Sequence, residues 1–289
     1  YIKSLPMLKK QQWITAGAGA VLLFSLFIFG KFTPPHEDHA DHGQAPAPAG
    51  QAAGFNFDQY IAEVKKEITP SQSAYLTSLE DALVRGDLVT QRKDNYQSLS
   101  DFWKDSVGLF IPYIYYLSEK AKLENSEKYL TFAAHSMLEE LRGTNDPGMR
   151  TWMANLANDL FSRSLKLNPK NDSTIIGLGS TYFFGASGAP MEGILKIREV
   201  AERDPKNVFA QFMLGYGGLV SGQNDKAIER FKSVYEMDPG NVEAVFLLAE
   251  LYERSGDKKQ ALEWYEKGKK DVSNPELLKA LEDKIKSLK

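Results

Sequence analysis

The chain has no cysteine among its 289 residues. This absence excludes structural disulfides, cysteine-ligated metals and a thiol nucleophile, because each of these needs a cysteine sulfur. It is compatible with an oxidising compartment but does not require one.

Motifs of the common catalytic sites are also missing. The sequence has no GxSxG elbow, no phosphate-binding loop, no dinucleotide fingerprint and no HExxH zinc motif, and the segment at 185–190 is interpreted as a turn. The net charge is only -3, so no basic surface points to a nucleic-acid partner. We therefore expect a protein that is not an enzyme, with no cofactor, no small-molecule substrate and no nucleic-acid partner.

Charge is absent from residues 13–30, which read WITAGAGAVLLFSLFIFG. This is about the minimum length that crosses a hydrocarbon core as a helix. Lys3, Lys9 and Lys10 precede the segment, whereas only Lys31 follows it closely. The charge rule places residues 1–12 in the cytoplasm and the rest across the membrane, which in a bacterium is the periplasm.

A cleaved signal peptide is the competing interpretation of this segment. A signal peptide ends in a small-x-small cleavage site, but the apolar run here ends in Gly30-Lys31-Phe32-Thr33-Pro34. We therefore predict a retained anchor in the bacterial inner membrane, with one transmembrane helix and the bulk of the chain periplasmic.

Residues 31–55 are predicted to form a flexible linker, because they are rich in Pro, Ala, Gly and His and lack periodicity. His36, His39 and His42 lie close together among acidic residues. Imidazole and carboxylate groups are ligands that a divalent metal accepts, so weak metal binding is one hypothesis for this tract. The alternative is a hydrated tether, because a flexible segment must lose conformational entropy to form a site.

A repeated pattern occupies the C-terminal part of the chain. Leu214 and Leu248, Ala227 and Ala261, and Phe231 and Tyr265 are each separated by 34 residues. Each copy pairs large apolar residues with small ones, which let two helices approach closely. A proline ends each copy, because proline lacks an amide donor and disfavours helix before it.

Related spacings occur upstream. Leu178-Gly179 repeats the signature of the first helix, and Ala157, Phe161 and Pro169 repeat the spacing of the second. The pattern resembles the tetratricopeptide repeat family, whose units are helix-turn-helix pairs of 34 residues. The resemblance implies an all-α solenoid behind the transmembrane helix, with degenerate repeats over 56–148, clear repeats over 149–275 and a capping helix over 276–289.

The resemblance also implies a groove that binds proteins or peptides. Units beginning at Asp172, Val208 and Val242 place matching positions of their first helices on that groove. The predicted partner-binding residues are Ile176, Phe183, Phe184, Phe209, Phe212, Tyr216, Leu219, Phe246, Glu250, Glu253 and Arg254.

This lining is aromatic at one end and acidic at the other. It favours an amphipathic helix or an extended apolar peptide with a basic flank. The alternative is a groove filled by the chain's own side chains. The Lys, Asn and Arg pattern of the family's carboxylate-binding members is missing, because the corresponding positions hold Ile176, Phe212 and Phe246. His135 lies in an apolar helix and is interpreted as a packing residue.

Together these features predict a membrane-anchored periplasmic scaffold for envelope protein export, folding or complex assembly. The layout is similar to the ancillary subunit of the Sec translocon, which acts with a chaperone. Two alternatives stay open at this point. One is a repeat subunit that presents apocytochromes for haem attachment, and the other is a metal-responsive protein that uses the linker histidines.

Overall fold

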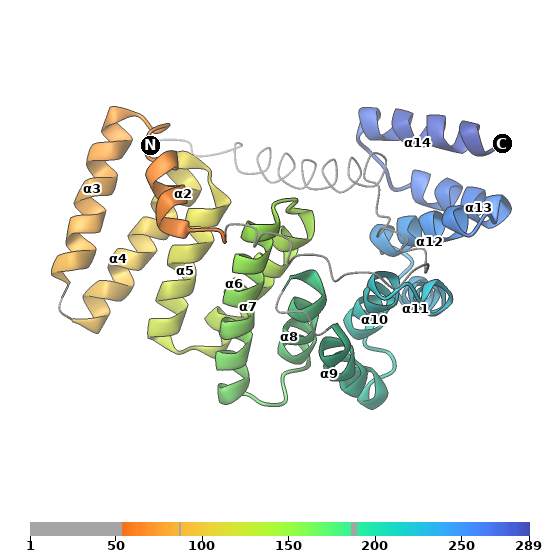
Figure 1. Ribbon diagram of the computed structural model, residues 1–289, viewed down its shortest axis with the longest axis horizontal. Helices are drawn as coiled ribbons and strands as arrows, with labels where there is room; N and C mark the ends of the chain where they lie inside the picture. The colour runs from red at the N-terminus through yellow and green to blue at the C-terminus, as the bar shows by residue number, and fades with distance from the viewer. Residues whose placement is uncertain (1–53, 87, 186–189) are drawn as a thin grey trace, which may run out of the picture. The chain divides into compact units, whose positions relative to one another are not determined.

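The computed structural model describes residues 54–86, 88–185 and 190–289. Within these ranges the chain is helical and forms no β-strand (Figure 1). In the same part of the chain, no helix has both the length and the apolar character to span a membrane. The predicted cytoplasmic segment, the predicted membrane helix and most of the predicted linker, residues 1–53, lie outside the described residues.

The chain forms two compact units, a larger one at Ala52–Gln223 and a smaller one that contains Asn224–Lys289. The helices of the larger unit are α2 (Phe57–Val64), α3 (Pro70–Arg85), α4 (Val89–Asp101), the π-helix η1 (Phe102–Val107), α5 (Phe110–Glu124), α6 (Glu127–Gly143), α7 (Pro147–Leu167), α8 (Asp172–Phe184), α9 (Pro190–Arg203) and α10 (Val208–Val220). Those of the smaller unit are α11 (Asn224–Met237), α12 (Val242–Arg254), α13 (Lys258–Lys269) and α14 (Pro275–Leu288).

Asparagine caps explain where the helices of the repeats begin. Asn171, Asn207 and Asn241 precede α8, α10 and α12, and each side chain accepts a hydrogen bond of 3.0 Å from the backbone N–H three residues later. Such caps satisfy donors that the first turn leaves without a partner. The preceding helices end two residues before a proline, as at Leu167 and Pro169.

The upstream helices follow the predicted pattern, with one difference. The pair α6 and α7 matches the two helices that the spacing of Ala157 and Phe161 predicts. After α4, however, the chain widens into η1, where the adjacent rings of Phe102 and Trp103 are both buried. Gln72 of α3 donates a hydrogen bond of 2.7 Å to the Ser106 carbonyl and so satisfies one acceptor of the π-helix.

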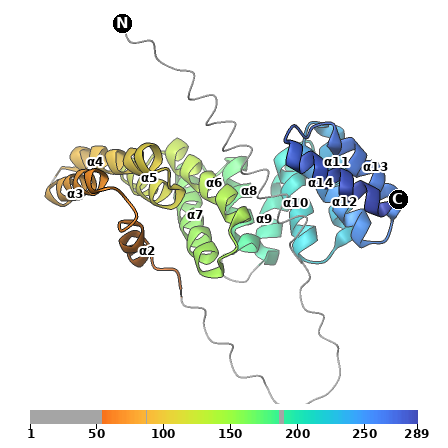
Figure 2. The same cartoon turned by 90° about the horizontal axis from the view of Figure 1, so that it is seen from above.

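Helix pairs of the larger unit have an inner and an outer helix. In Figure 2, α6 and α8 lie along one side of this unit, and α7 and α9 lie along the other. Glycine brings α8 and α9 together. A Cβ added at Gly193 would lie 2.1 Å from the carbonyl oxygen of Gly179, which is too close for any side chain. The prediction that Gly179 allows close helix contact is confirmed.

An aromatic cluster attaches the first described segment to the repeats. The Phe57 ring stacks on Trp152 of α7 with centroids 5.6 Å apart and lies 3.8 Å from the Tyr115 ring of α5. Phe55 contacts Trp152 as well, at 4.9 Å. Phe55, the last residue of the predicted linker, thus belongs to this cluster.

Candidate protein-binding surface

Side chains from α6, α8 and α10 form the inner surface of the larger unit. Of the predicted groove residues of α8, Ile176 is fully buried and Phe183 is 9% exposed, whereas Phe184 is half-buried. Ser180 is also fully buried, and its hydroxyl donates to the Ile176 carbonyl at 2.8 Å. The middle helix of this surface is thus covered by its neighbours.

Arg142 of α6 covers one end of α8. Its guanidinium lies 5.0 Å from the centroid of Tyr216, 5.7 Å from that of Phe212 and 6.0 Å from that of Phe184. It donates a hydrogen bond of 3.4 Å to the Tyr216 hydroxyl, and it pairs with the Glu139 carboxylate at 3.2 Å. The Arg142 side chain is only 7% exposed, so the cation is held against three rings inside the chain.

His135 of α6 covers the other end of α8. Its ring lies 4.9 Å from Phe161 of α7 and 5.8 Å from Phe209 of α10, and its Nε2 is hydrogen-bonded to Ser173 Oγ at 2.9 Å. Burial lowers the pKa of His135 below its ordinary value of 6.5, and an interaction with the Ser173 backbone partly offsets this effect. The contacts confirm that His135 is a packing residue.

These contacts leave a narrower exposed surface than the sequence predicted. Phe212 is 6% exposed and lies beneath Arg142. The side chains that solvent still reaches form what we call the inner rim: Phe132, Phe184, Phe209, Tyr216, Leu219 and Val220. The surface is therefore filled by the chain itself over most of α8 and stays partly open at Phe184 and along α6 and α10.

Charge is scarce on the inner rim. The only charged residue in α8 and α10 is Asp172, and it forms an ion pair with Arg203 of α9. On α6, Arg142 and Glu139 pair with one another, and the exposed Lys128 lies one turn before Phe132. This surface thus offers aromatic and aliphatic groups with little net charge.

The predicted groove residues of α12 lie in the smaller unit and have other partners. Phe246 is 6% exposed and packs on Gly268 of α13, where an added Cβ would lie 2.8 Å from the ring. Glu253 accepts hydrogen bonds from the Tyr265 hydroxyl at 2.9 Å and from Lys284 of α14 at 2.5 Å. Its carboxylate therefore holds the last helix in place.

Glu250 and Arg254 complete the predicted set on α12. Burial raises the pKa of Glu250, with a smaller opposing contribution from Arg254. Arg254 itself is exposed. Both remain predicted partner-binding residues, because neither takes part in the packing of α13 or α14 as Glu253 does.

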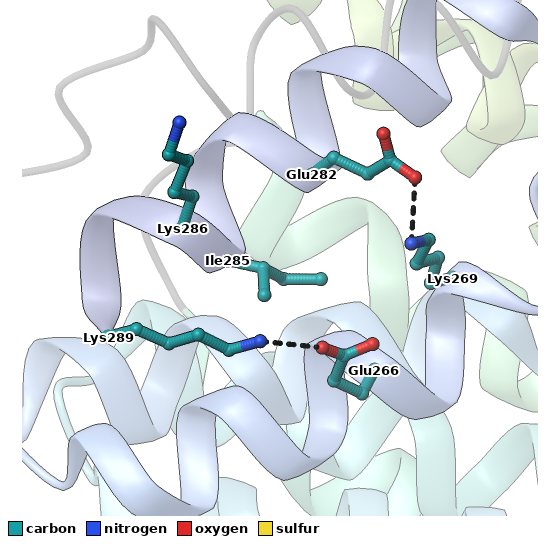
Figure 3. Close-up of a pocket in the computed structure, with 6 residues that line it drawn as sticks. All are labelled: Glu266, Lys269, Glu282, Ile285, Lys286 and Lys289. Atoms are coloured by element: carbon teal, nitrogen blue, oxygen red, sulfur yellow. Dashed lines mark hydrogen bonds and ion pairs between the residues drawn. The ribbon is translucent and has the colours of Figure 1, made fainter.

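A small hollow lies between α13 and α14 (Figure 3). Two ion pairs flank it, Lys269 with Glu282 at 2.7 Å and Lys289 with Glu266 at 3.4 Å. Its volume is about 190 Å³. Sites for small molecules usually enclose roughly 300 Å³ or more, and here Lys269 and Lys289 are already paired, so the hollow is better explained as the seam of the last helix.

Metal-ligand geometry is not found in the part of the chain that the structure describes. In these ranges no three His, Asp or Glu side chains are grouped so that they could hold an ion. The predicted ligands His36, His39 and His42 lie outside the described residues.

Comparison with known proteins supports the repeat pattern. Residues 219–285 match the family described as Tetratricopeptide repeat. Residues 219–285 therefore carry tetratricopeptide repeats. The match runs from the end of α10 through most of α14, and it includes both members of the 34-residue pairs at Ala227 and Phe231.

Solved structures with tetratricopeptide or similar helical folds resemble the chain at low identity. A thermophilic TPR protein of Thermus thermophilus is 16% identical with a TM-score of 0.50, over 68% of this chain and 98% of that chain. MamA of Desulfovibrio magneticus RS-1 is 19% identical with a TM-score of 0.43, over 63% and 94% of the two chains. YrrB, a TPR protein with an unusual peptide-binding site, is 18% identical with a TM-score of 0.41, over 71% and 97%. No curated protein matches the chain.

Sequence reasoning missed Arg142 as a member of the inner surface. The tetratricopeptide positions were aligned only from Asp172 onward, whereas Arg142 belongs to the earlier and longer helix α6. A signal was present, because His135 and Arg142 are seven residues apart and therefore lie on one side of a helix. Extending the alignment upstream would have placed both beside α8.

Proposed function

We propose that this chain is a non-enzymatic scaffold that binds protein partners on the inner rim of its tetratricopeptide repeats. The observation that carries the proposal is the exposure of large apolar side chains on α6 and α10. Phe132 is 53% exposed and lies one turn from His135, while Val220 is 48% exposed and lies one turn from Tyr216. Apolar groups gathered on one surface favour a protein-binding site.

The sequence of residues 13–30 supports a further part of the proposal, a single membrane anchor. With the basic residues on its N-terminal side, this anchor would hold the repeats in the periplasm. A scaffold placed there would serve the export, folding or assembly of envelope proteins.

Photocrosslinking in native membranes tests the binding surface. Probes are placed at Phe132 and Val220, which are 53% and 48% exposed, and control probes at Leu195 and Met191 of α9, which are 54% and 57% exposed. All four are apolar and similarly accessible, but α9 belongs to the outer helices. The proposal expects the same protein to be captured from both inner positions and from neither control. Equal capture from all four positions would reject the inner rim as the binding surface.

The anchor has a separate test. The full chain and a variant without residues 1–31 are compared by extraction of membranes at alkaline pH and by protease treatment of spheroplasts. We expect the full chain to stay in the membrane fraction and to be digested from outside, and the shortened chain to be extracted. A full chain released at alkaline pH, or one protected in spheroplasts, would contradict the anchor or its orientation.

A further inference from the structure

The first described helix, α2, lies on the outer side of the larger unit. Figure 2 places it on the side of α7 and α9, away from α6 and α8. Phe57 is its main anchor, because the centroid of the Phe57 ring lies 3.8 Å from that of Tyr115 and 5.6 Å from that of Trp152. A third ring, that of Tyr116, meets Phe57 edge to face at 6.2 Å. We call Tyr115, Tyr116 and Trp152 the outer aromatic surface.

Side chains alone attach this segment to the repeats. In the described part of the chain, the one hydrogen bond that joins residues 54–68 to another element runs from Lys65 Nζ to the Glu80 carboxylate, at 2.7 Å. The two side chains are 35% and 31% exposed. The backbone hydrogen bonds of the segment stay within the segment. A short helix that docks on the surface of another protein is held in the same way, by a few anchor side chains.

The following helix, α3, does not depend on α2 for its first turn. Thr69 and Gln72 form a capping box, in which the Thr69 hydroxyl accepts from the Gln72 backbone N–H at 3.3 Å. The Gln72 side chain in turn accepts from the Thr69 backbone N–H at 2.9 Å. This box satisfies donors that the start of α3 would otherwise leave without a partner. Residues 65–69 connect the two helices, so α2 can leave its surface while α3 stays capped.

The segment buries little of itself. α2 has eight residues, and an isolated helix of fewer than roughly 12 residues is only marginally stable in water. Ile61 is its one buried side chain, whereas Phe55, Phe57 and Tyr60 are half-buried. Local opening of such a segment requires less free energy than unfolding of the packed repeats. Opening would expose the outer aromatic surface, and exposed aromatic patches of this kind favour the binding of a protein.

We infer that the outer aromatic surface is a second protein-binding site, and that residues 55–65 occupy it as a tethered ligand which a partner segment of the same chemistry replaces. The present occupant defines that chemistry. It has two phenylalanines one residue apart, a tyrosine and an isoleucine three and four positions after the second phenylalanine, and a lysine four positions after the isoleucine. The partner's lysine would pair with Glu80. The site is separate from the inner rim and does not rest on the proposed function.

The tether sets the affinity that a partner needs. A short connection keeps the segment at an effective concentration of about 1 mM next to its surface. A free peptide with the same sequence therefore competes poorly in the natural chain. It should bind well only when the tethered segment is weakened and the outer aromatic surface is left intact.

The test measures binding of a fluorescent peptide with the sequence of residues 54–66 to the full chain in lipid nanodiscs. Fluorescence anisotropy reports the binding, and empty nanodiscs are the blank. The natural chain is compared with Phe57→Ala, which changes the tethered segment and no residue of the surface beneath it. We expect the Phe57→Ala chain to bind the peptide at least about tenfold more tightly, because the tethered competitor has lost its contacts with three rings.

Two further variants locate the site. Adding Trp152→Ala to the Phe57→Ala chain removes a ring of the outer aromatic surface and should abolish binding of the peptide. Adding Phe132→Ala instead removes an exposed ring of the inner rim, and this change should leave the affinity within about twofold.

Variants of the peptide test the pattern. A peptide that carries both Phe55→Ala and Phe57→Ala should not bind. A peptide with Lys65→Glu should bind about threefold less tightly than the natural sequence, because it meets the Glu80 carboxylate with a like charge.

Phe55→Ala replaces Phe57→Ala in the chain if the latter does not fold, since Phe55 also contacts Trp152. The inference is overturned if the folded variant binds the peptide no more tightly than the natural chain, or if binding survives Trp152→Ala. It is also overturned if neither variant folds, because the segment would then belong to the core. Light scattering that finds a dimer of the natural chain, lost in Phe57→Ala, would replace the partner with a second copy of this chain.

Discussion

The guanidinium of Arg142 donates a hydrogen bond to the hydroxyl of Tyr216 across 3.4 Å, although 74 residues separate the two in the chain. Arg142 belongs to α6 and Tyr216 to α10. The bond therefore joins two helices that α8 separates in the chain. His135 and Phe209 make a second connection between the same helices. Together they explain why Ile176 is buried at a position that the repeat pattern assigns to an open groove.

Replacing Arg142 with alanine should destabilise the larger unit. The change removes a nearly buried cation from three rings together with its hydrogen bond to Tyr216, and we expect a loss of about 2 kcal/mol. Urea unfolding followed by circular dichroism measures it. The matched control is Arg163→Ala on α7. Arg163 forms an ion pair with Asp159, and the two side chains are 46% and 43% exposed, so the pair should contribute less than about 0.5 kcal/mol to stability. Equal losses for the two variants would contradict the prediction.

Gly193→Ala should separate α8 from α9. The new methyl group would lie 2.1 Å from the Gly179 carbonyl oxygen, and backbone cannot move aside as a side chain does. We expect a loss of about 1–3 kcal/mol, measured by thermal unfolding. Gly143→Ala is the control, because nothing lies within 4 Å of its added Cβ, and it should be neutral or stabilise by up to about 1 kcal/mol. A stable Gly193→Ala protein would show that the helices are further apart than described.

Glu253→Ala should loosen α14. The Glu253 carboxylate accepts hydrogen bonds from Tyr265 and from Lys284, and the Lys284 side chain is 34% exposed. Loss of this carboxylate leaves two donors of adjacent helices without an acceptor. Amide hydrogen exchange across residues 275–288 should become at least several-fold faster. Glu266→Ala serves as the control. The side chains of Glu266 and Lys289, which form an ion pair, are 47% and 62% exposed, so this substitution should leave the exchange almost unchanged. Protection of α14 that is identical in both variants would disprove this role.

His135 should make the larger unit less stable in mild acid. Burial lowers its pKa in the folded chain, so the unfolded chain binds the proton more readily. The stability that neutral His135 contributes is therefore complete above about pH 6.5 and is lost as the pH falls from there toward the lower folded pKa.

The measurement for His135 is the difference in unfolding free energy between the natural chain and His135→Gln from pH 8 to pH 5. Glutamine keeps a group that can bond Ser173 but does not titrate. Glu250 has a raised pKa and the opposite sign, yet it is present in both proteins and cancels in the difference. A difference that stays constant with pH would refute the assignment.

Repeat spacing was sufficient to predict the pairs that share a helix hairpin. Ala227 and Ala261, like Phe231 and Tyr265, are equivalent positions in two successive repeats. Each of these residues packs within its own repeat, and the same packing recurs in the next repeat. The same reasoning placed α6 and α7 from Ala157 and Phe161. It failed at η1, because a widened turn depends on how two adjacent rings, Phe102 and Trp103, fit one core.

The candidate site was predicted only in part. Phe209, Tyr216 and Leu219 keep partial exposure and remain predicted binding residues. Phe212 is covered by Arg142, and Glu253 is bound by Lys284, 31 residues further along the chain. The repeat alignment from Asp172 onward predicted neither cover, because each comes from a long side chain of a helix outside the repeat that it covers.

By itself the sequence determined the helix pairs of the repeats and the type of side chain at each inner position, because these depend on neighbours within about 34 residues. The tertiary structure alone decided which inner positions remain exposed. That outcome depends on whether α6 comes close enough to α10 for Arg142 and His135 to reach its rings. Contacts between side chains so distant in the chain follow from packed distances, which a repeat period does not contain.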